Sequence, residues 1–217
     1  MKYLISFLLL LTGCAGADMN TVQDIDGNVY PVVRIGKQLW MAKNLEVTRY
    51  RNGDSILLLH DDIKWSTSQE GAYCMYQHDT GYVRDYGLLY NWHAVSDSRN
   101  IAPEGWRIPT SEDLAILVAS LRGDTVAGVA MKTAAPGYWH YPYTGADSSS
   151  GFAALPGGYR YGPDGSFHTL GSNGYWWHNR GSYELYAWSN RFYSYFADVQ
   201  RDPEYMEFGF SVRCIKE

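Results

Sequence analysis

The clearest periodic pattern of apolar residues lies in the middle of the chain. Four apolar residues recur at the i, i+3, i+4 and i+7 spacing: Leu114, Leu117, Val118 and Leu121. This spacing places them on one face of a helix. Thr110 is a suitable N-cap before acidic residues in the first turn, and Gly123 is a suitable C-cap. The pattern therefore predicts a helix between Thr110 and Gly123.

Shorter patterns predict the remaining elements. A weaker second helix is expected over residues 125–132. Two β-rich runs, 29–35 and 38–41, flank Gly36-Lys37 and predict a hairpin. Everything after Pro136 lacks helical periodicity and consists of short aromatic runs separated by Gly, Ser, Asn and Pro turns. The chain is therefore expected to form a loop-rich domain with two helices and several short strands.

The first fourteen residues have the pattern of a secretory signal. A basic start precedes an apolar run at residues 3–11, which is too short to span a bilayer. A small residue and Cys14 follow, and this arrangement resembles the bacterial lipobox, in which the cysteine is lipidated and becomes the new N-terminus. The alternative is an ordinary signal peptide with an unrelated cysteine. We expect a signal at 1–13, a lipidated tether at 14–21 and one domain at 22–217.

Composition supports one compact exported domain. The chain has 217 residues, of which 16% are aromatic and 22 are glycines. Its formal net charge of −5 argues against nucleic acid as a partner, because nucleic-acid binding uses a basic surface. We expect a tethered domain that reaches the membrane through its N-terminal lipid. The expected location is the outer membrane, at the cell surface or on the periplasmic face.

The three cysteines suggest one disulfide. If Cys14 carries lipid, Cys74 and Cys214 remain as a pair in an oxidising compartment. A disulfide between Cys74 and Cys214 would join the C-terminal strand to the middle of the chain. The alternative is two separate buried thiols.

The sequence contains no familiar catalytic or metal-binding motif. His-Glu-x-x-His, Gly-x-Ser-x-Gly and phosphate-loop motifs are missing, and the histidines have no ligand-like spacing. The acidic run at 24–28 does not fit a calcium loop, because Gly27 is fourth rather than sixth and Ile35 occupies the twelfth position. Asp26-Gly27 instead predicts a tight turn. We expect no enzyme activity, no cofactor and no metal.

The C-terminal region carries the best candidate for a binding surface. Between Ser172 and Phe208, Tyr and Trp are interleaved with Ser, Asn and Asp, a composition that antibody loops use for recognition. The candidate ligand-binding residues are Tyr183, Tyr186, Ser189, Arg191, Tyr193, Tyr195, Asp198, Asp202 and Tyr205. We expect these tyrosines to lie mostly exposed on one shared side.

Strand alternation divides this region between two faces. One face is expected to carry Arg191, Tyr193 and Tyr195. Phe192 and Phe196 are expected to point inward, because Phe has no hydroxyl group to satisfy. The tryptophans of the region are expected in the core: Trp176, Trp177 and Trp188.

Several sequence blocks together resemble one known family. They are DIDGNVY (24–30) with IGKQLWMAKNL (35–45), YGLLYNW (86–92), PEGWRIPT (103–110), GFAALPGGYR (151–160), GYWW (174–177) and GFSVRC (209–214). In this order they closely resemble the Fibrobacter succinogenes major paralogous domain, which is common in exported lipoproteins of Bacteroidetes and their relatives. The resemblance covers nearly everything from Val22 to the end.

The resemblance implies an α+β domain of C-type-lectin-like fold, with small twisted, mostly antiparallel sheets, two helices and long loops. It also implies a distant relation to formylglycine-generating enzyme-like domains, which use a copper-binding cysteine pair. Cys214 instead lies in an ending typical of the non-enzymatic relatives. Many relatives carry a cysteine before the Pro-x-Gly-Trp block, where this chain has Ala102. That departure leaves Cys74 as the available partner for Cys214.

The expected function is an exported surface lipoprotein that acts as a non-catalytic, adhesin- or receptor-like binding module for a glycan or protein. In some members of the resembled group, diversity-generating retroelements vary the C-terminal region, and the resemblance permits that here. Two alternatives stay open. One is a structural subunit of a surface assembly, and the other is an enzyme related to the formylglycine-generating group.

The membrane anchor can be tested directly. Cys14→Ser should leave an unlipidated precursor that no longer partitions with membranes, because the acyl chains supply the membrane affinity. Metabolic labelling with a fatty-acid analogue and membrane fractionation measure this. Label at another residue, or membrane partitioning of the variant equal to that of the wild type, would contradict the prediction.

Overall fold

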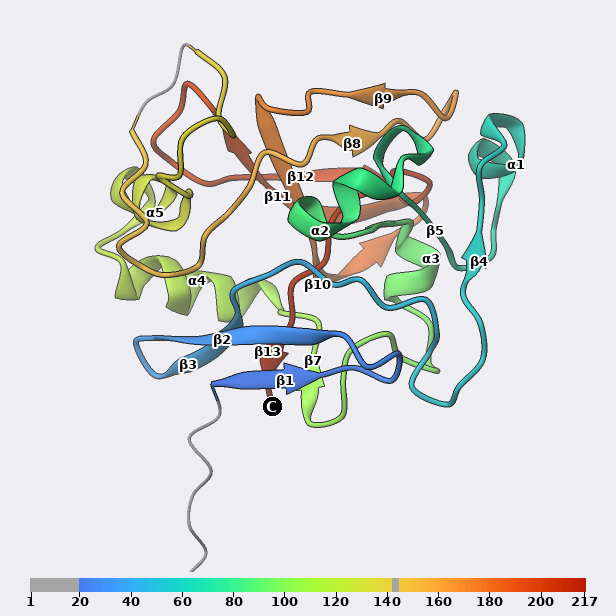
Figure 1. Cartoon of the computed structure of the whole chain (residues 1–217), viewed down its shortest axis with the longest axis horizontal. Helices are drawn as coiled ribbons and strands as arrows, with labels where there is room; N and C mark the ends of the chain where they lie inside the picture. Colours follow the sequence, from blue (N-terminus) through green and yellow to red (C-terminus); the bar gives the residue numbers. More distant parts are fainter. Residues whose placement is uncertain (1–19, 142–144) are drawn as a thin grey trace, which may run out of the picture.

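The largest sheet joins the two ends of the described chain. The computed structural model describes residues 20–141 and 145–217, so Cys14 and the predicted signal lie outside the described residues. The sheet has the antiparallel order β1-β2-β3-β13-β7. Its strands are β1 Thr21–Gln23, β2 Val29–Ile35, β3 Gln38–Met41, β7 Trp106–Arg107 and β13 Ile215–Lys216. The C-terminal strand β13 therefore lies between β3 and β7 (Figure 1).

The second sheet is a three-stranded antiparallel ribbon. Its strands are β10 Asn173–Tyr183, β11 Tyr186–Tyr193 and β12 Gln200–Tyr205, in that spatial order. A bulge interrupts the β10–β11 pairing between His178 and Ser182. Two smaller sheets consist of β4 Leu57–Leu58, β5 Ala72–Cys74 and β6 Leu89–Tyr90, and of β8 Tyr159–Arg160 and β9 Phe167–His168. β4 and β5 pair in parallel, whereas the other strand pairs are antiparallel.

Both predicted helices are present. The first, α4 (Ser111–Ser120), begins with a capping box: the Thr110 side chain accepts from the Asp113 backbone, and the Asp113 carboxylate accepts from the Thr110 backbone at 2.6 Å. The second is α5 (Asp124–Met131). Three short helices were not predicted: α1 Asp62–Thr67, α2 Val83–Tyr86 and α3 Trp92–Val95. Two 3₁₀ turns, η1 Tyr76–His78 and η2 Thr80–Tyr82, precede α2. These elements are too short for a helical period to show in the sequence.

Within residues 20–141 and 145–217, no single helix is long and apolar enough to cross a membrane. α4 and α5 reach that length and composition only as a pair bent by 88°.

The predicted N-terminal hairpin is confirmed. β2 and β3 pair with Ile35 opposite Gln38, and Gly36 in the turn has a φ of 59°. A Cβ added at Gly36 would come within 2.5 Å of the Ser120 hydroxyl. Glycine is therefore required both for the backbone conformation and for the close approach of α4.

The predicted turn at 24–28 also forms, and its carboxylates are used within the fold. Asp24 accepts from the Tyr30 hydroxyl at 2.5 Å and from the Asp26 backbone at 2.9 Å. Asp26 accepts from the Thr48 hydroxyl at 2.9 Å and from Arg49 Nε at 2.5 Å. These hydrogen bonds join β1, β2 and the chain after β3.

Strand β10 separates two large hydrophobic clusters. Trp177 belongs to the cluster that includes Tyr30, Trp106 and Phe210. Its neighbour Trp176 belongs to the cluster that packs α4 and α5 against the first sheet. Adjacent strand residues point to opposite faces, so one strand supplies large rings to both clusters. The prediction that Trp176 and Trp177 are core residues is confirmed.

A buried guanidinium connects these clusters. Arg213 donates from Nε and Nη2 to Asn44 Oδ1 at 3.1 and 2.7 Å, and from Nη1 to the Phe152 carbonyl. Asn44 Oδ1 also accepts from Trp176 Nε1 at 2.8 Å, and Asn44 Nδ2 donates to the Tyr86 carbonyl at 2.8 Å. Arg213 has no carboxylate partner among the described residues, and burial lowers its pKa to about 9. Its charge is stabilised by neutral acceptors and by the Phe152 ring, 4.3 Å away.

A second buried guanidinium joins the small sheets to α1. Arg160 donates to the carbonyls of Leu59 and Gly165 at 2.6 and 2.9 Å, and to Asp62 Oδ1 at 2.7 Å. It also lies over the Trp65 ring, 4.5 Å from the ring centroid. Arg160 thus connects β8 to the start of α1.

The predicted disulfide is wrong. Cys74 and Cys214 are free, fully buried thiols that belong to different hydrophobic clusters. Burial raises the pKa of Cys74 to about 12 and raises that of Cys214 as well. The alternative of two separate buried thiols is the one that the structure adopts. A count of cysteines allows a pair but carries no information on where the fold places each thiol.

The Arg213 contact predicts a large loss of stability when Asn44 is removed. Asn44→Ala should lower the free energy of unfolding by about 3 kcal/mol, because a buried guanidinium and an indole lose their shared acceptor. Urea unfolding measures the change, and Asn20→Ala at an exposed position is the control. A loss below about 1 kcal/mol would contradict this role.

Candidate functional site

The predicted ligand-binding residues do not share one side of the ribbon. Tyr183 pairs with Tyr186, and Tyr186 pairs with Tyr205, so these three point to one face. The opposite face carries Ser189, Arg191, Tyr193 and Asp202. Tyr195 and Asp198 lie in the connection between β11 and β12. The prediction of a single shared face is therefore wrong, because the residues are separated by odd numbers of positions along β11.

Exposure separates them further. Ser189 is fully buried and cannot contact a ligand directly. Tyr186, Arg191, Tyr193, Asp198 and Asp202 are half-buried. The inward placement of Phe192 is confirmed, whereas Phe196 is 44% exposed. Phe196 lies beyond the end of β11, where strand alternation no longer decides direction. Trp188, expected in the core, is only half-buried.

Three aromatic rings gather where β11 ends. We call Tyr193, Tyr195 and Phe196 the aromatic ridge. Their ring centroids lie 5.5 Å (Tyr193–Tyr195), 5.6 Å (Tyr193–Phe196) and 4.6 Å (Tyr195–Phe196) apart, with interplanar angles of 40°, 90° and 54°. Tyr195 is 49% exposed, similar to Phe196. The ridge therefore presents a faceted aromatic surface to solvent.

The backbone beneath the ridge is held by buried groups. The Ser194 N–H donates to the Ser172 carbonyl at 2.8 Å, and Lys132 Nζ donates to the Phe196 carbonyl at 2.5 Å. A Cβ added at Gly128 would lie 2.2 Å from the Ala197 carbonyl, so α5 packs directly against this connection. The ridge is positioned by the core rather than by its own rings.

Lys132 is an unusual support because its ammonium group is buried. It lies 5.3 Å from the centroid of the Trp139 ring. Burial lowers the pKa of Lys132 to about 8, and the negative charge of Asp198 opposes this shift. Burial therefore disfavours the charged form of Lys132, and this charged group nevertheless donates a hydrogen bond to the Phe196 carbonyl.

Arg191 fixes the first ring of the ridge. It forms ion pairs with Glu204 and, at 3.6 Å, with Asp202 of β12. Its Nη1 donates to the Tyr193 hydroxyl at 3.2 Å. Its guanidinium also lies 5.7 Å from the centroid of the Tyr175 ring. Arg191 and Asp202 therefore contact each other within the ribbon, and Arg191 orients the Tyr193 ring.

A second exposed group lies at the β10–β11 hairpin tip. We call Tyr183, Leu185 and Tyr205 the hairpin tip patch, and they are 71%, 60% and 40% exposed. Tyr186 supports the patch with its ring centroid 4.8 Å from that of Tyr205. Tyr186, beside the patch, and Tyr193, in the ridge, are seven residues apart along β11. At about 3.3 Å per residue, the patch and the ridge are therefore separated by about 23 Å along the strand. One small ligand cannot contact both.

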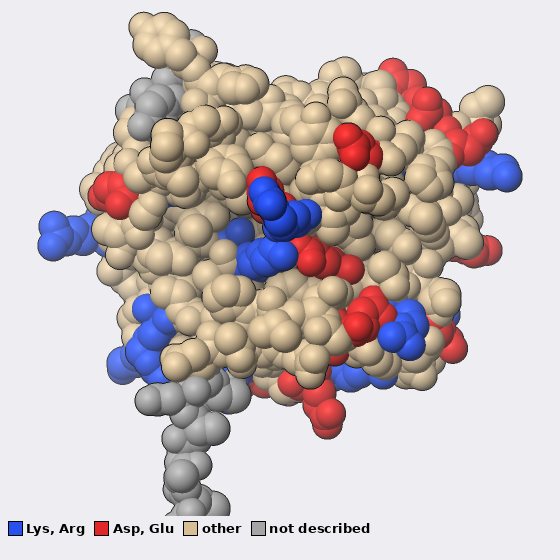
Figure 2. Space-filling model, in the orientation of Figure 1, with Lys and Arg blue, Asp and Glu red and all other residues tan. Residues whose placement is uncertain are grey.

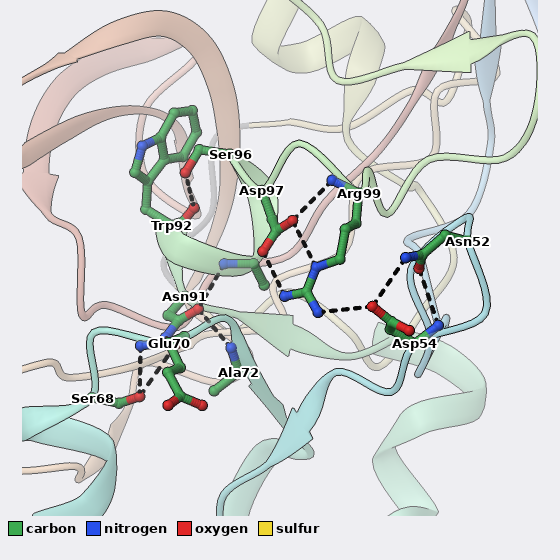
Figure 3. Close-up of polar contacts among 11 residues, drawn as sticks. Asn52, Asp54, Ser68, Glu70, Ala72, Asn91, Trp92, Ser96, Asp97 and Arg99 are labelled. Carbon is green, nitrogen blue, oxygen red and sulfur yellow. Dashed lines mark hydrogen bonds and ion pairs between the residues drawn. The ribbon is translucent and has the colours of Figure 1, made fainter.

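A polar pocket forms a third candidate, which we call the Arg99 pocket. It has a volume of about 370 Å³ and is lined by Tyr50, Ser55, Leu57, Gln69, Glu70, Gly71, His93, Ser96, Asp97 and Arg99. Figure 3 shows Arg99 held between Asp97 and Asp54, with Glu70 and α3 beside it. The volume is within the range of small-molecule sites.

One Ser–His contact lies in the turn before β9 and in β9 itself. Ser166 Oγ lies 2.7 Å from His168 Nε2, but Asp164 contacts Ser166 and does not orient the histidine. No group of three or more His, Cys, Asp or Glu side chains within residues 20–141 and 145–217 could hold a metal ion.

The charged residues do not form a continuous basic surface on the visible face. In Figure 2 that face is mostly uncharged, with mixed charges near its centre and acidic residues near α1. Asp61 and Asp62 begin α1, and Lys64 follows within it.

The helices and strands form a mixed α/β domain with small, mostly antiparallel sheets and few helices. The family model for the Fibrobacter succinogenes major domain matches residues 33–216, so the chain belongs to this family. The predicted family is confirmed. Searches of the curated proteins and of the solved structures found no match.

Sequence reasoning missed Lys132 and the Arg99 pocket. The spacing of Asp97 and Arg99 is a local signal, because the Asp97 carboxylate accepts from the Arg99 backbone at 2.8 Å. The contact between Arg99 and Asp54 crosses 45 positions and has no local signal. Lys132 was predicted only as the end of a helix, and nothing in the sequence indicated its burial.

Lys132 predicts a specific pH dependence of stability. Between pH 8 and 10.5 the unfolded chain keeps a Lys132 proton that the folded chain has lost, so the free energy of unfolding gains a contribution that rises with pH. Lys132→Met should remove this rise. Urea unfolding of both proteins at several pH values measures the difference, with exposed Lys64→Met as the control. Parallel curves for wild type and Lys132→Met would contradict the prediction.

Proposed function

We propose that this protein is a non-catalytic ligand-binding lipoprotein of the outer membrane, anchored by lipid on Cys14 and displayed at the cell surface. We further propose that its domain has a C-type-lectin-like fold. The ligand contacts the aromatic ridge and belongs to the glycans. The whole ribbon does not take part, because Ser189 is buried and Arg191 is held in ion pairs between its two exposed ends.

The exposure of the ridge is the observation that carries this proposal. A fully buried Phe contributes about 1.5–3 kcal/mol to stability, and Phe196 forgoes much of that while neighbouring Phe192 is buried. Buried Ser194 and Lys132 hold the backbone on both sides of Tyr195. Rings that are exposed and yet positioned lose little freedom on binding.

A glycan fits this surface better than a flat protein partner. Aromatic faces pack against the apolar faces of sugar rings, and the three ridge rings are tilted by 40° to 90° relative to one another. Rings tilted in this way can contact successive sugar units of a bent oligosaccharide. Half-buried Asp198 and Gln200, hydrogen-bonded to each other, lie next in the chain and provide polar groups beside the rings.

The hairpin tip patch favours a second candidate function, a structural subunit of a surface assembly. Tyr183, Leu185 and Tyr205 form an exposed apolar surface, which is a mark of protein–protein contact. β12 is also an edge strand, although Pro203 limits its pairing with another strand.

Matched double variants separate the two candidates. Tyr195→Ala with Phe196→Ala should abolish binding on a glycan array, while each exposed substitution changes the free energy of unfolding by only about 0.5 kcal/mol. Tyr183→Ala with Leu185→Ala is the control and should leave glycan binding intact. Glycan binding that survives loss of the ridge, or that is lost with the hairpin tip patch, would contradict the proposal.

A further inference from the structure

The Arg99 pocket is separate from both aromatic surfaces. Its walls come from the chain around Tyr50 and β4, from the loop before β5, and from α3 with the turn that follows it. Tyr193, Tyr195 and Phe196 do not line it, and neither do Tyr183, Leu185 and Tyr205. A ligand in this pocket would therefore bind independently of the proposed glycan.

Arg99 organises one wall of the pocket. It donates from Nε and Nη2 to the two carboxylate oxygens of Asp97 at 3.0 and 2.7 Å, and from Nη1 to Asp54 at 3.2 Å (Figure 3). Its guanidinium lies over the Tyr50 ring, 4.0 Å from the centroid. Asn52 and Arg99 hold the pKa of Asp54 below its usual range, and Arg99 does the same for Asp97. The guanidinium is therefore held by two ionised carboxylates.

Other polar groups at the pocket have no partner within the described residues. The exposed Glu70 carboxylate takes part in no ion pair or hydrogen bond there, and the Gln69 amide is exposed beside it. Deeper in the wall, the buried Tyr50 hydroxyl interacts with Asp97 and Arg99, whereas His93 Nε2 lacks a hydrogen-bond partner among the described residues. The Tyr50 hydroxyl lies against Gly71, where an added Cβ would come within 2.0 Å. Unsatisfied polar groups at one pocket point to a polar ligand.

The charges decide the kind of ligand. Glu70 and Asp97 line the pocket, and Asp54 pairs with Arg99 beside it, so the carboxylates outnumber the single guanidinium of Arg99. A cation is therefore attracted and an anion is repelled. Burial lowers the pKa of His93 and so favours its neutral ring. The hydroxyl, amide and neutral imidazole groups of the lining both donate and accept hydrogen bonds, as ligand hydroxyls do.

We propose that the Arg99 pocket binds a small hydroxylated amine of the size of an amino sugar, with its ammonium group at Glu70. The pocket volume of about 370 Å³ accommodates a molecule of this size. Arg99, held by Asp97 and Asp54, forms a rigid wall of the pocket and does not contact the ammonium group of the ligand.

Three probes with the same ring test the charge preference. Glucosamine, glucose and glucose 6-phosphate are titrated into the full mature protein in detergent, and binding is measured by calorimetry. Glucosamine should bind at least about tenfold more tightly than glucose, the difference expected for one charge-assisted hydrogen bond, and glucose 6-phosphate should bind more weakly still. Equal affinity for glucosamine and glucose, tighter binding of the phosphate, or no binding of glucosamine would overturn the proposal.

Variants then locate the site. Glu70→Gln should weaken glucosamine binding about tenfold, whereas Glu112→Gln at an exposed position of α4 should not change it. Tyr195→Ala with Phe196→Ala should also leave glucosamine binding unchanged, so failure of the glycan proposal and failure of this one give different results. Unchanged binding by Glu70→Gln, or a loss caused by the ridge variant, would overturn the assignment to this pocket.

Discussion

The hydrogen bonds between Arg213 and Asn44 are the interaction on which the rest of the structure depends. Asn44 follows the first hairpin, and Arg213 precedes the last strand, so their contact brings the two ends of the domain together. Trp176 donates to the same oxygen, which ties the C-terminal ribbon to this point. Because the guanidinium is buried without a carboxylate partner in the described chain, its neutral acceptors must be placed accurately.

The high aromatic content requires polar partners as well as packing. Buried Tyr and Trp side chains carry a donor that must be satisfied, and the structure supplies acceptors across long stretches of sequence. Tyr90 donates to the Val47 carbonyl, Trp65 to the Glu207 carbonyl and Trp177 to the Tyr90 carbonyl. These bonds specify how the small sheets fit together. Tyr195 and Phe196 are exposed instead of buried, which is why the ridge is the candidate for ligand contact.

The ribbon explains why the binding region is narrower than its composition suggests. Both of its faces carry buried residues: Ala187 packs into one hydrophobic cluster and Phe192 into the other. Because β11 is buried on one face near its start and on the other face near its end, only the residues at and beyond its two ends are exposed enough to contact a ligand. The ridge and the hairpin tip patch occupy those two ends, whereas Arg191 and Ser189 between them serve the sheet.

The sequence by itself determined the family, the first hairpin, the turn at 24–28 and both longer helices, because their signals are local: apolar spacing, caps and glycine turns. The preference of Phe for burial also predicted that Phe192 points inward. Only the tertiary structure decided which surfaces remain exposed. Contacts between distant segments decide the direction of Phe196, the burial of Lys132 and the ion pair between Arg99 and Asp54. They also decide the separation of Cys74 from Cys214. Local spacing carries no information about such contacts, since it describes one element and not the elements packed against it.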